Sequence, residues 1–163
     1  MKPTKIGRVD PNSGIWDYLN QLPFKHDTYK TTVKRKILAI KTEIQYKYNG
    51  NIYLPGYRDE RVEAFLSRIM PTWGTALVLR YEPGGKISPH RDTTGYGRTV
   101  CTVSSEPYIL TLDTVHYKIL ANTVISFPSK TVHSAHHETN NTRLVLCCWE
   151  FDKSKLSRSL TTS

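Results

Sequence analysis

The chain has 163 residues, a length that fits one domain burying about two-thirds of the surface its unfolded form exposes. Glycine and proline contents are ordinary and no segment is low in complexity, which excludes a disordered chain. Lys and Arg number 23 against 14 Asp and Glu, and the resulting net charge of +9 indicates an anionic partner: a nucleic acid, an acidic protein or an anionic cosubstrate.

Neither the first ten residues nor any later run has the apolar character of a signal peptide or a membrane span. We therefore expect a soluble, cytoplasmic protein with no membrane partner. The three cysteines, Cys101, Cys147 and Cys148, lie in apolar strand-like runs and lack C-x-x-C spacing. Their odd number and their setting favour buried free thiols over a disulfide.

The first predicted element is a short helix within residues 11–24. Asn12 or Ser13 is its predicted N-cap, apolar residues recur with helical spacing, and Pro23 ends it. The pattern predicts a helix that buries one apolar stripe and exposes its other side.

A hairpin and a second helix follow. Residues 37–55 carry two β-rich runs on either side of Asn49-Gly50, a strong hairpin signal. Residues 59–70 have helical apolar spacing, with Asp59 as the predicted N-cap and Pro71 as the stop.

From residue 75 the pattern becomes one of short strands separated by turn residues, which is typical of a sandwich or barrel. The eight predicted runs are 75–83, 86–90, 98–104, 108–113, 115–120, 122–128, 132–138 and 143–151. We expect an α+β, mainly β fold in which two helices and a hairpin pack on a barrel. Residues 1–152 would form one domain with its core at about 75–152, and 153–163 a basic, flexible tail.

Two metal-capable side chains stand out in residues 81–99, YEPGGKISPHRDTTGYGRT. His90 and Asp92 are two positions apart, so on an extended strand they point to the same side. An oxygenase-type Fe(II) site needs two imidazoles and one carboxylate on one face of the metal. Two ligands alone fit a polar turn equally well, so the pair needs a third ligand from elsewhere in the chain.

The third ligand would come from a histidine cluster further along the chain. His133 and His137 share one side of an extended strand, and His136 lies on the other. Strand parity leaves His133 and His137 open, whereas the spacing to Arg143 favours His133. Arg143 is itself unusual, because a cation in the apolar run RLVLCCWEF requires an anion to meet it. A dicarboxylate cosubstrate would suit the planar fork of its guanidinium.

In order and spacing, His90, Asp92, His133 and Arg143 resemble the Fe(II)- and 2-oxoglutarate-dependent oxygenases. The resemblance covers about residues 75–152 and implies a double-stranded β-helix, a jelly-roll or cupin-like barrel. It also implies a catalytic metal site in which His90, Asp92 and His133 bind Fe(II). Arg143, helped by Tyr81, would then bind the far carboxylate of 2-oxoglutarate, with ascorbate as reductant.

The ending of the chain is most similar to the prolyl-hydroxylase branch, which carries a tryptophan at the position of Trp149. That branch implies hydroxylation of a peptide or protein side chain with release of succinate and CO2. The short interval after Asp92 predicts an open site with substrate loops from the hairpin and from residues 91–98.

Two alternatives remain open. The lead-in at Tyr81 is shared with AlkB-type nucleic-acid demethylases, although Leu79, Val145 and Trp149 depart from their pattern. A nucleic-acid oxygenase of that kind would suit the positive charge. The other alternative is a cupin-like metal-binding module without catalytic turnover.

Overall fold

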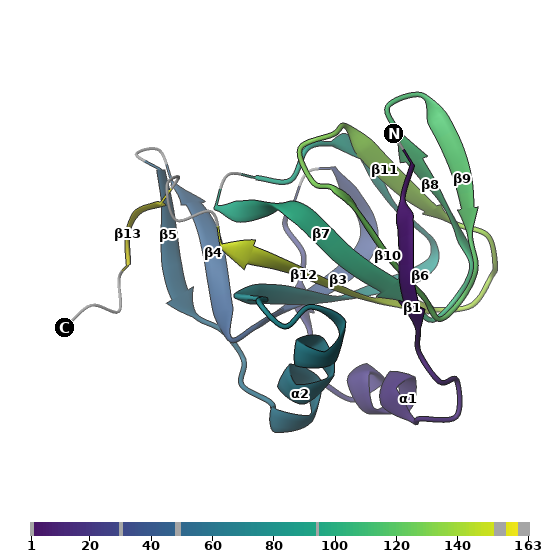
Figure 1. The fold of residues 1–163 in the computed structure, drawn as a ribbon, viewed down its shortest axis with the longest axis horizontal. Coiled ribbons are helices and arrows are strands. Elements are labelled where there is room, and N and C mark those ends of the chain that lie inside the picture. The colour runs from purple at the N-terminus through teal and green to yellow at the C-terminus, as the bar shows by residue number, and fades with distance from the viewer. Residues whose placement is uncertain (1, 30, 48–49, 94, 152–155, 160–163) are drawn as a thin grey trace.

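The structure is a computed structural model that describes residues 2–29, 31–47, 50–93, 95–151 and 156–159 (Figure 1). Its two helices are α1 (Ile15–Asn20) and α2 (Glu60–Ile69). Its strands up to residue 90 are β1 (Thr4–Arg8), β2 (Lys25–His26), β3 (Thr32–Ile40), β4 (Thr42–Lys47), β5 (Gly50–Pro55) and β6 (Thr75–His90). The later strands are β7 (Tyr96–Ser104), β8 (Tyr108–Leu112), β9 (Val115–Ile119), β10 (Thr123–Pro128), β11 (His133–His137), β12 (Arg143–Phe151) and β13 (Leu156–Ser159).

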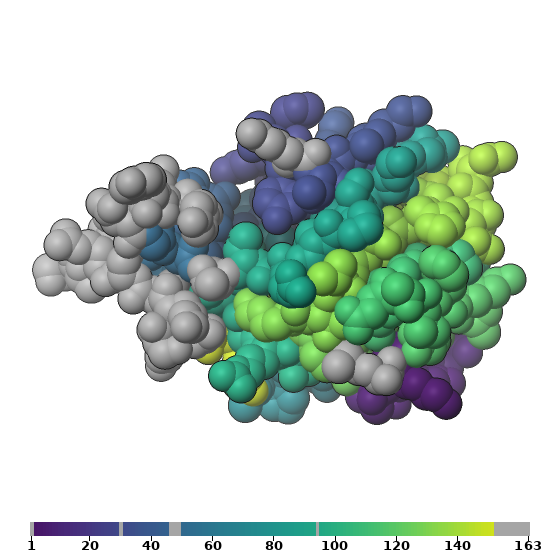
Figure 2. All heavy atoms as spheres, turned by 90° about the horizontal axis from the view of Figure 1, so that it is seen from above, coloured from purple at the N-terminus to yellow at the C-terminus, as the bar shows by residue number. Residues whose placement is uncertain are grey.

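Ten of these strands form one curled antiparallel sheet, with the order β1-β10-β7-β12-β6-β11-β8-β9 and with β3 pairing β6 and β2. This is the predicted mainly β, double-stranded β-helix, or jelly roll. The core is wider than predicted, because β1 and β3 from the N-terminal part are strands of the same sheet. Figure 2, which views the face opposite the helices, has the purple and blue N-terminal residues beside the teal and green strands.

Strand β6 is the longest element and belongs to both halves of the barrel. Its first part pairs β12 and its last part pairs β11, while β3 follows it on the other edge. The sequence predicted two runs here, split at Gly84-Gly85, but the chain continues through a bulge in which Gly84 has a φ of 81°. Because glycine tolerates a left-handed conformation, the strand bends there without ending, so seven strands replace the eight predicted runs.

The central strands β3, β6 and β12 have two different faces. The helix face packs against α1 and α2, which lie beneath these strands in Figure 1, and consists of Leu38, Ile40, Ala76, Val78, Leu144, Leu146 and Cys148. The pocket face lines the interior of the barrel and consists of Arg35, Ile37, Leu77, Leu79, Tyr81, Arg143, Val145, Cys147 and Trp149. Because strand residues alternate sides, the odd-numbered positions of β12 and of β6 before its bulge face the pocket, and the even-numbered positions face away from it.

The two helices form where the sequence predicted them, with one correction. Asp59 caps α2 by accepting a hydrogen bond from the Val62 amide, as expected. Helix α1 begins after Gly14, whose φ of 76° is left-handed, and neither Asn12 nor Ser13 is the N-cap. None of the helices among the described residues is long and apolar enough to cross a membrane.

A second sheet of three strands, β13-β5-β4, extends beside the barrel. Strands β4 and β5 form the predicted hairpin, with Lys47 opposite Gly50, while Asn49 of the predicted turn lies outside the described residues. Residues 156–159, expected in a flexible tail, form β13 and pair with β5 in parallel. The remainder of that tail, 153–155 and 160–163, lies outside the described residues.

Candidate metal and cosubstrate site

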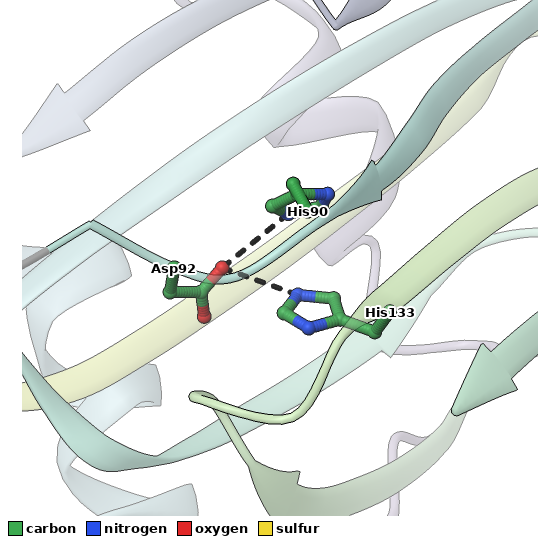
Figure 3. Close-up of side chains that lie close together, drawn as sticks. All are labelled: His90, Asp92 and His133. Carbon is green, nitrogen blue, oxygen red and sulfur yellow. Dashed lines mark ion pairs between the residues drawn. The ribbon is translucent and has the colours of Figure 1, made fainter. Parts of the chain in front are cut away.

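The side chains of His90, Asp92 and His133 converge on one point (Figure 3). His90 is the last residue of β6, Asp92 follows two residues later, and His133 is the first residue of β11. His90 and His133 are paired neighbours on these antiparallel strands, and their ring centroids are 4.3 Å apart. Asp92 Oδ1 lies 3.4 Å from His90 Nε2 and 3.1 Å from His133 Nε2. The three ligand atoms lie within 4.8 Å of one another, so two imidazoles and one carboxylate face one point, the donor set that suits Fe(II).

The other two histidines of the cluster lie away from this point. His137 Nδ1 is 3.1 Å from the Gly85 carbonyl oxygen, and its ring packs edge-on against Tyr81. Burial lowers the pKa of His137, which favours its neutral form. His136 is exposed on the opposite side of β11. Of the two histidines that strand parity left open, the structure therefore brings His133 to Asp92.

Backbone carbonyls orient both imidazoles. His90 Nδ1 lies 2.8 Å from the Ser88 carbonyl oxygen, and His133 Nδ1 lies 2.7 Å from that of Thr131. A carbonyl oxygen only accepts hydrogen bonds, so each Nδ1 carries a proton, and Nε2 is the ring nitrogen left to bind a metal at the common point in place of its own proton. This tautomer is the one that a metal site needs.

Asp92 is held by contacts from strands remote in sequence. The indole Nε1 of Trp149 donates to Asp92 Oδ2 at 2.9 Å, and the Asp92 amide donates to the Ser129 carbonyl at 3.0 Å. Tyr96 packs on the Trp149 ring with centroids 4.3 Å apart. From the sequence, Trp149 served only to compare families and had no assigned role in the site. Its odd-numbered position on β12, shared with Arg143, was the signal that could have placed it on the pocket face.

The three residues are coupled electrostatically. Burial by itself raises the pKa of Asp92, but hydrogen bonds with His133 and His90 outweigh it and hold that pKa well below its usual range. Burial likewise lowers the pKa of His133, while the hydrogen bond with Asp92 more than offsets this and raises it. Asp92 is therefore ionised at neutral pH, as a metal ligand must be.

A pocket of about 960 Å³ opens beside the three residues and runs into the barrel. Arg143 lies on its wall, with only 1% of the residue exposed. Its Nη1 donates to Ser104 Oγ at 3.4 Å, and its Cζ lies 4.4 Å from the ring centroid of Tyr81 and 4.8 Å from that of Tyr108. Desolvation lowers the pKa of the guanidinium, so burial disfavours its charge.

Arg143 lacks the partners that a buried guanidinium needs. Its Nε and Nη2 are buried and have no hydrogen-bond acceptor within the described part of the chain, nor does any described carboxylate form an ion pair with it. Buried donors normally have partners, so these two atoms mark a place for an anionic acceptor. A carboxylate would suit the planar fork of the guanidinium at this place.

Tyr81 is next to Arg143 on the pocket face and is 2% exposed. Its hydroxyl accepts a hydrogen bond from Arg35 Nη1 at 3.2 Å, and Arg35 Nε in turn donates to Asp27 Oδ2. From the sequence, neither Arg35 nor Asp27 had an assigned role. Both residues line the pocket.

The expected substrate loops lie at the pocket. Glu43, Ile44 and Gln45 of the hairpin line it, as do Thr93 and Tyr96 from the other predicted loop. Residues 25–29, which include β2, and Thr31 also line the pocket, although the sequence did not indicate them.

Comparison with known proteins supports the fold but does not assign the chain to a family. No family model matches the chain, and no curated protein does. A structure of OsALKBH1, an AlkB homologue, is similar with a TM-score of 0.57 and 12% identity, over 82% of this chain and 88% of that one. The Cnp3 cupin domain of Schizosaccharomyces pombe follows with a TM-score of 0.46 and 10% identity, over 81% and 71% of the two chains.

At such identities the likeness concerns the fold alone. The likeness to OsALKBH1 agrees with the double-stranded β-helix fold described above. It gives no support to the prolyl-hydroxylase branch that the sequence favoured.

Proposed function

We propose that this protein is an Fe(II)- and 2-oxoglutarate-dependent oxygenase. The observation that carries the proposal is the buried Arg143, which lines the same pocket as His90, Asp92 and His133 and has two donors without a partner in the described part of the chain. A cupin-like module that only bound a metal would have no use for a second, anion-binding group in the pocket. Such a group lowers stability unless a ligand meets it.

Each residue has a separate task in this proposal. The metal would be held by Nε2 of His90, Nε2 of His133 and a carboxylate oxygen of Asp92. The hydrogen bond from Trp149 keeps that carboxylate oriented. Arg143 and Tyr81 bind the far carboxylate of 2-oxoglutarate and so direct its oxo-acid end to the metal. When bound, Fe(II) and 2-oxoglutarate would supply, with O2 as the oxidant, the hydroxylation of a substrate C–H bond: one oxygen atom goes to the substrate and the other to succinate, and CO2 is released. The apolar wall around Leu79 and Val145 limits water in the pocket.

For the substrate we favour a nucleic acid over a peptide. Support comes from the net charge of +9, which suits a phosphate backbone, and from the likeness in fold to an AlkB homologue. The peptide interpretation relied on Trp149, but the bond from Trp149 to Asp92 accounts for this tryptophan whatever the substrate. A pocket of about 960 Å³ exceeds what a metal and one small dicarboxylate need, which leaves room for part of a substrate.

Succinate formation tests the enzyme proposal. The purified protein with Fe(II), ascorbate and 2-oxoglutarate should release succinate, and His90→Ala and Asp92→Ala should abolish this. Arg80→Gln is a matched control, because Arg80 lies on β6 outside the pocket and pairs with the partly exposed Glu82. Absence of iron-dependent succinate from the wild-type protein, with or without candidate substrates, would favour the metal-binding module instead.

Substrate class is tested with panels of oligonucleotides and peptides, read by mass spectrometry as gain of one oxygen or loss of an alkyl group. We expect turnover of an oligonucleotide, with binding that weakens steeply as salt rises because counterions are released from the phosphates. Salt-insensitive oxidation of a peptide would instead restore the hydroxylase interpretation.

A further inference from the structure

Three side chains form a row across neighbouring strands on the pocket face. Tyr81 of β6 is paired with Arg35 of β3 on one side and with Arg143 of β12 on the other. The guanidinium carbon lies 5.7 Å from the tyrosine ring centroid for Arg35 and 4.4 Å for Arg143. Because cross-strand partners on one face are immediate neighbours, the phenol lies between two arginines.

The two arginines differ in how their charge is met. Arg35 forms an ion pair with Asp27, and the side chains of the pair are 6% and 4% exposed. Its own counter-charge is therefore part of the protein. Arg143 has no such carboxylate among the described residues and keeps two donors unpartnered. An incoming anion is consequently expected to bind Arg143 rather than Arg35.

Besides its ion pair with Asp27, Arg35 forms a hydrogen bond with Tyr81. Its Nη1 donates to the Tyr81 hydroxyl at 3.2 Å, and within the described part of the chain this hydroxyl has no other hydrogen-bond partner. A phenol oxygen that accepts one hydrogen bond still has its own proton to donate. Since Tyr81 is almost fully buried, the nearby acceptor for that proton would be a ligand held by Arg143.

We propose that Arg35, anchored by Asp27, is a positioning residue that orients the Tyr81 hydroxyl as a second donor to the carboxylate bound by Arg143. This inference rests on the proposed function and specifies how the site selects its cosubstrate. Guanidinium and phenol together recognise the far carboxylate of a 2-oxo dicarboxylate. A 2-oxo acid of equal length without that carboxylate gains nothing from either group.

The test is a double-mutant cycle on cosubstrate affinity, measured by calorimetry without oxygen in the metal-loaded protein. Arg35→Gln and Tyr81→Phe should each weaken 2-oxoglutarate binding roughly tenfold or more, the effect of losing one hydrogen bond to a charged group. Because Arg35 acts through Tyr81, the double variant should bind no more weakly than Tyr81→Phe alone. The control Arg80→Gln, next to Tyr81 on β6 but outside the pocket, should bind 2-oxoglutarate as tightly as the wild type does.

A second probe separates positioning from general damage. The affinity for 2-oxopentanoate, which lacks the far carboxylate, should be the same in the wild type and all these variants. Arg35→Gln leaves Asp27 unpaired, so the neutral pair Asp27→Asn/Arg35→Gln is measured as well and should match Arg35→Gln in its affinity for 2-oxoglutarate.

Three outcomes would overturn the inference. Wild-type affinity for 2-oxoglutarate in both Arg35 variants would mean that the residue has no such role. Additive losses in the double variant would mean that Arg35 acts by its own charge. Equal losses for 2-oxopentanoate would indicate a damaged pocket. A wild-type protein that binds no 2-oxoglutarate would instead overturn the proposed function itself, and the inference with it.

Discussion

The helix face and the pocket face of the central strands are made by alternate residues of the same segments, yet they differ in chemistry. On the helix face, Val78 and Leu146 pack with other buried apolar side chains against α1 and α2. On the pocket face, Tyr81 and Arg143 are buried just as deeply, and two donors of Arg143 have no partner among the residues that the structure describes. The comparison indicates that one face stabilises the fold, while the other retains groups that lower stability and serve a ligand.

The largest expected change in stability comes from the helix face. Leu146→Ala removes a fully buried side chain and should lower the free energy of unfolding by about 2–5 kcal/mol. Leu79→Ala, on the pocket face, should lower it less, because its side chain borders an existing pocket. Denaturant unfolding monitored by circular dichroism measures both. Equal losses would contradict the division of the two faces.

The reverse pattern is expected at Arg143. Arg143→Met keeps most of the volume but removes the buried charge, so the unfolding midpoint should be unchanged or raised. The free energy of 2-oxoglutarate binding should become less favourable by about 1.5–3 kcal/mol or more, because charged hydrogen bonds to its carboxylate are lost. Calorimetry gives this affinity, and metal binding serves as the control. A loss of metal binding equal to the loss of cosubstrate binding would mean that the role of Arg143 is misassigned.

A smaller effect is expected at Trp149. Trp149→Phe retains an aromatic ring against Tyr96 but removes the indole donor to Asp92. Loss of a hydrogen bond to a metal-ligating side chain typically weakens metal binding roughly 10- to 100-fold, and we expect an effect in that range. Titration with Fe(II) or Co(II) would measure it. Unchanged metal affinity with an unchanged melting temperature would return Trp149 to a packing role alone.

The smallest difference between the two faces is expected in the reactivity of two adjacent thiols, one on each face. Cys147 lines the pocket, and burial raises its pKa to about 11, whereas Cys148 is fully buried on the helix face. Only about one thiol in a thousand at position 147 is ionised at pH 8, and this fraction grows as the pH approaches 11. Alkylation mapped by mass spectrometry should therefore be slow at both positions in the folded protein. Rapid labelling of Cys147 at pH 7 would show that the pocket face is wetter than its burial indicates.

The fold was predictable where local patterns were unambiguous and less so where strands meet. Alternation and turn residues predicted a β barrel from residue 75, and the two helices formed at their expected places. The break expected at Gly84-Gly85 is a bulge, since glycine permits both a turn and a bend within a continuous strand. Membership of β1 and β3 in the barrel depends on pairing partners far along the chain, which short-range patterns do not specify.

By itself, the sequence predicted a metal and anion site at His90, Asp92, His133 and Arg143, with His137 left open as an alternative to His133. Only the tertiary structure decided that the histidine at Asp92 is His133, because the pairing of β11 with β6 sets which ring lies opposite His90. The bond from Trp149 to Asp92 and the row from Arg35 to Arg143 likewise depend on the register between strands. Register is a property of the whole sheet, and a shift of one residue would turn each of these side chains to the other face.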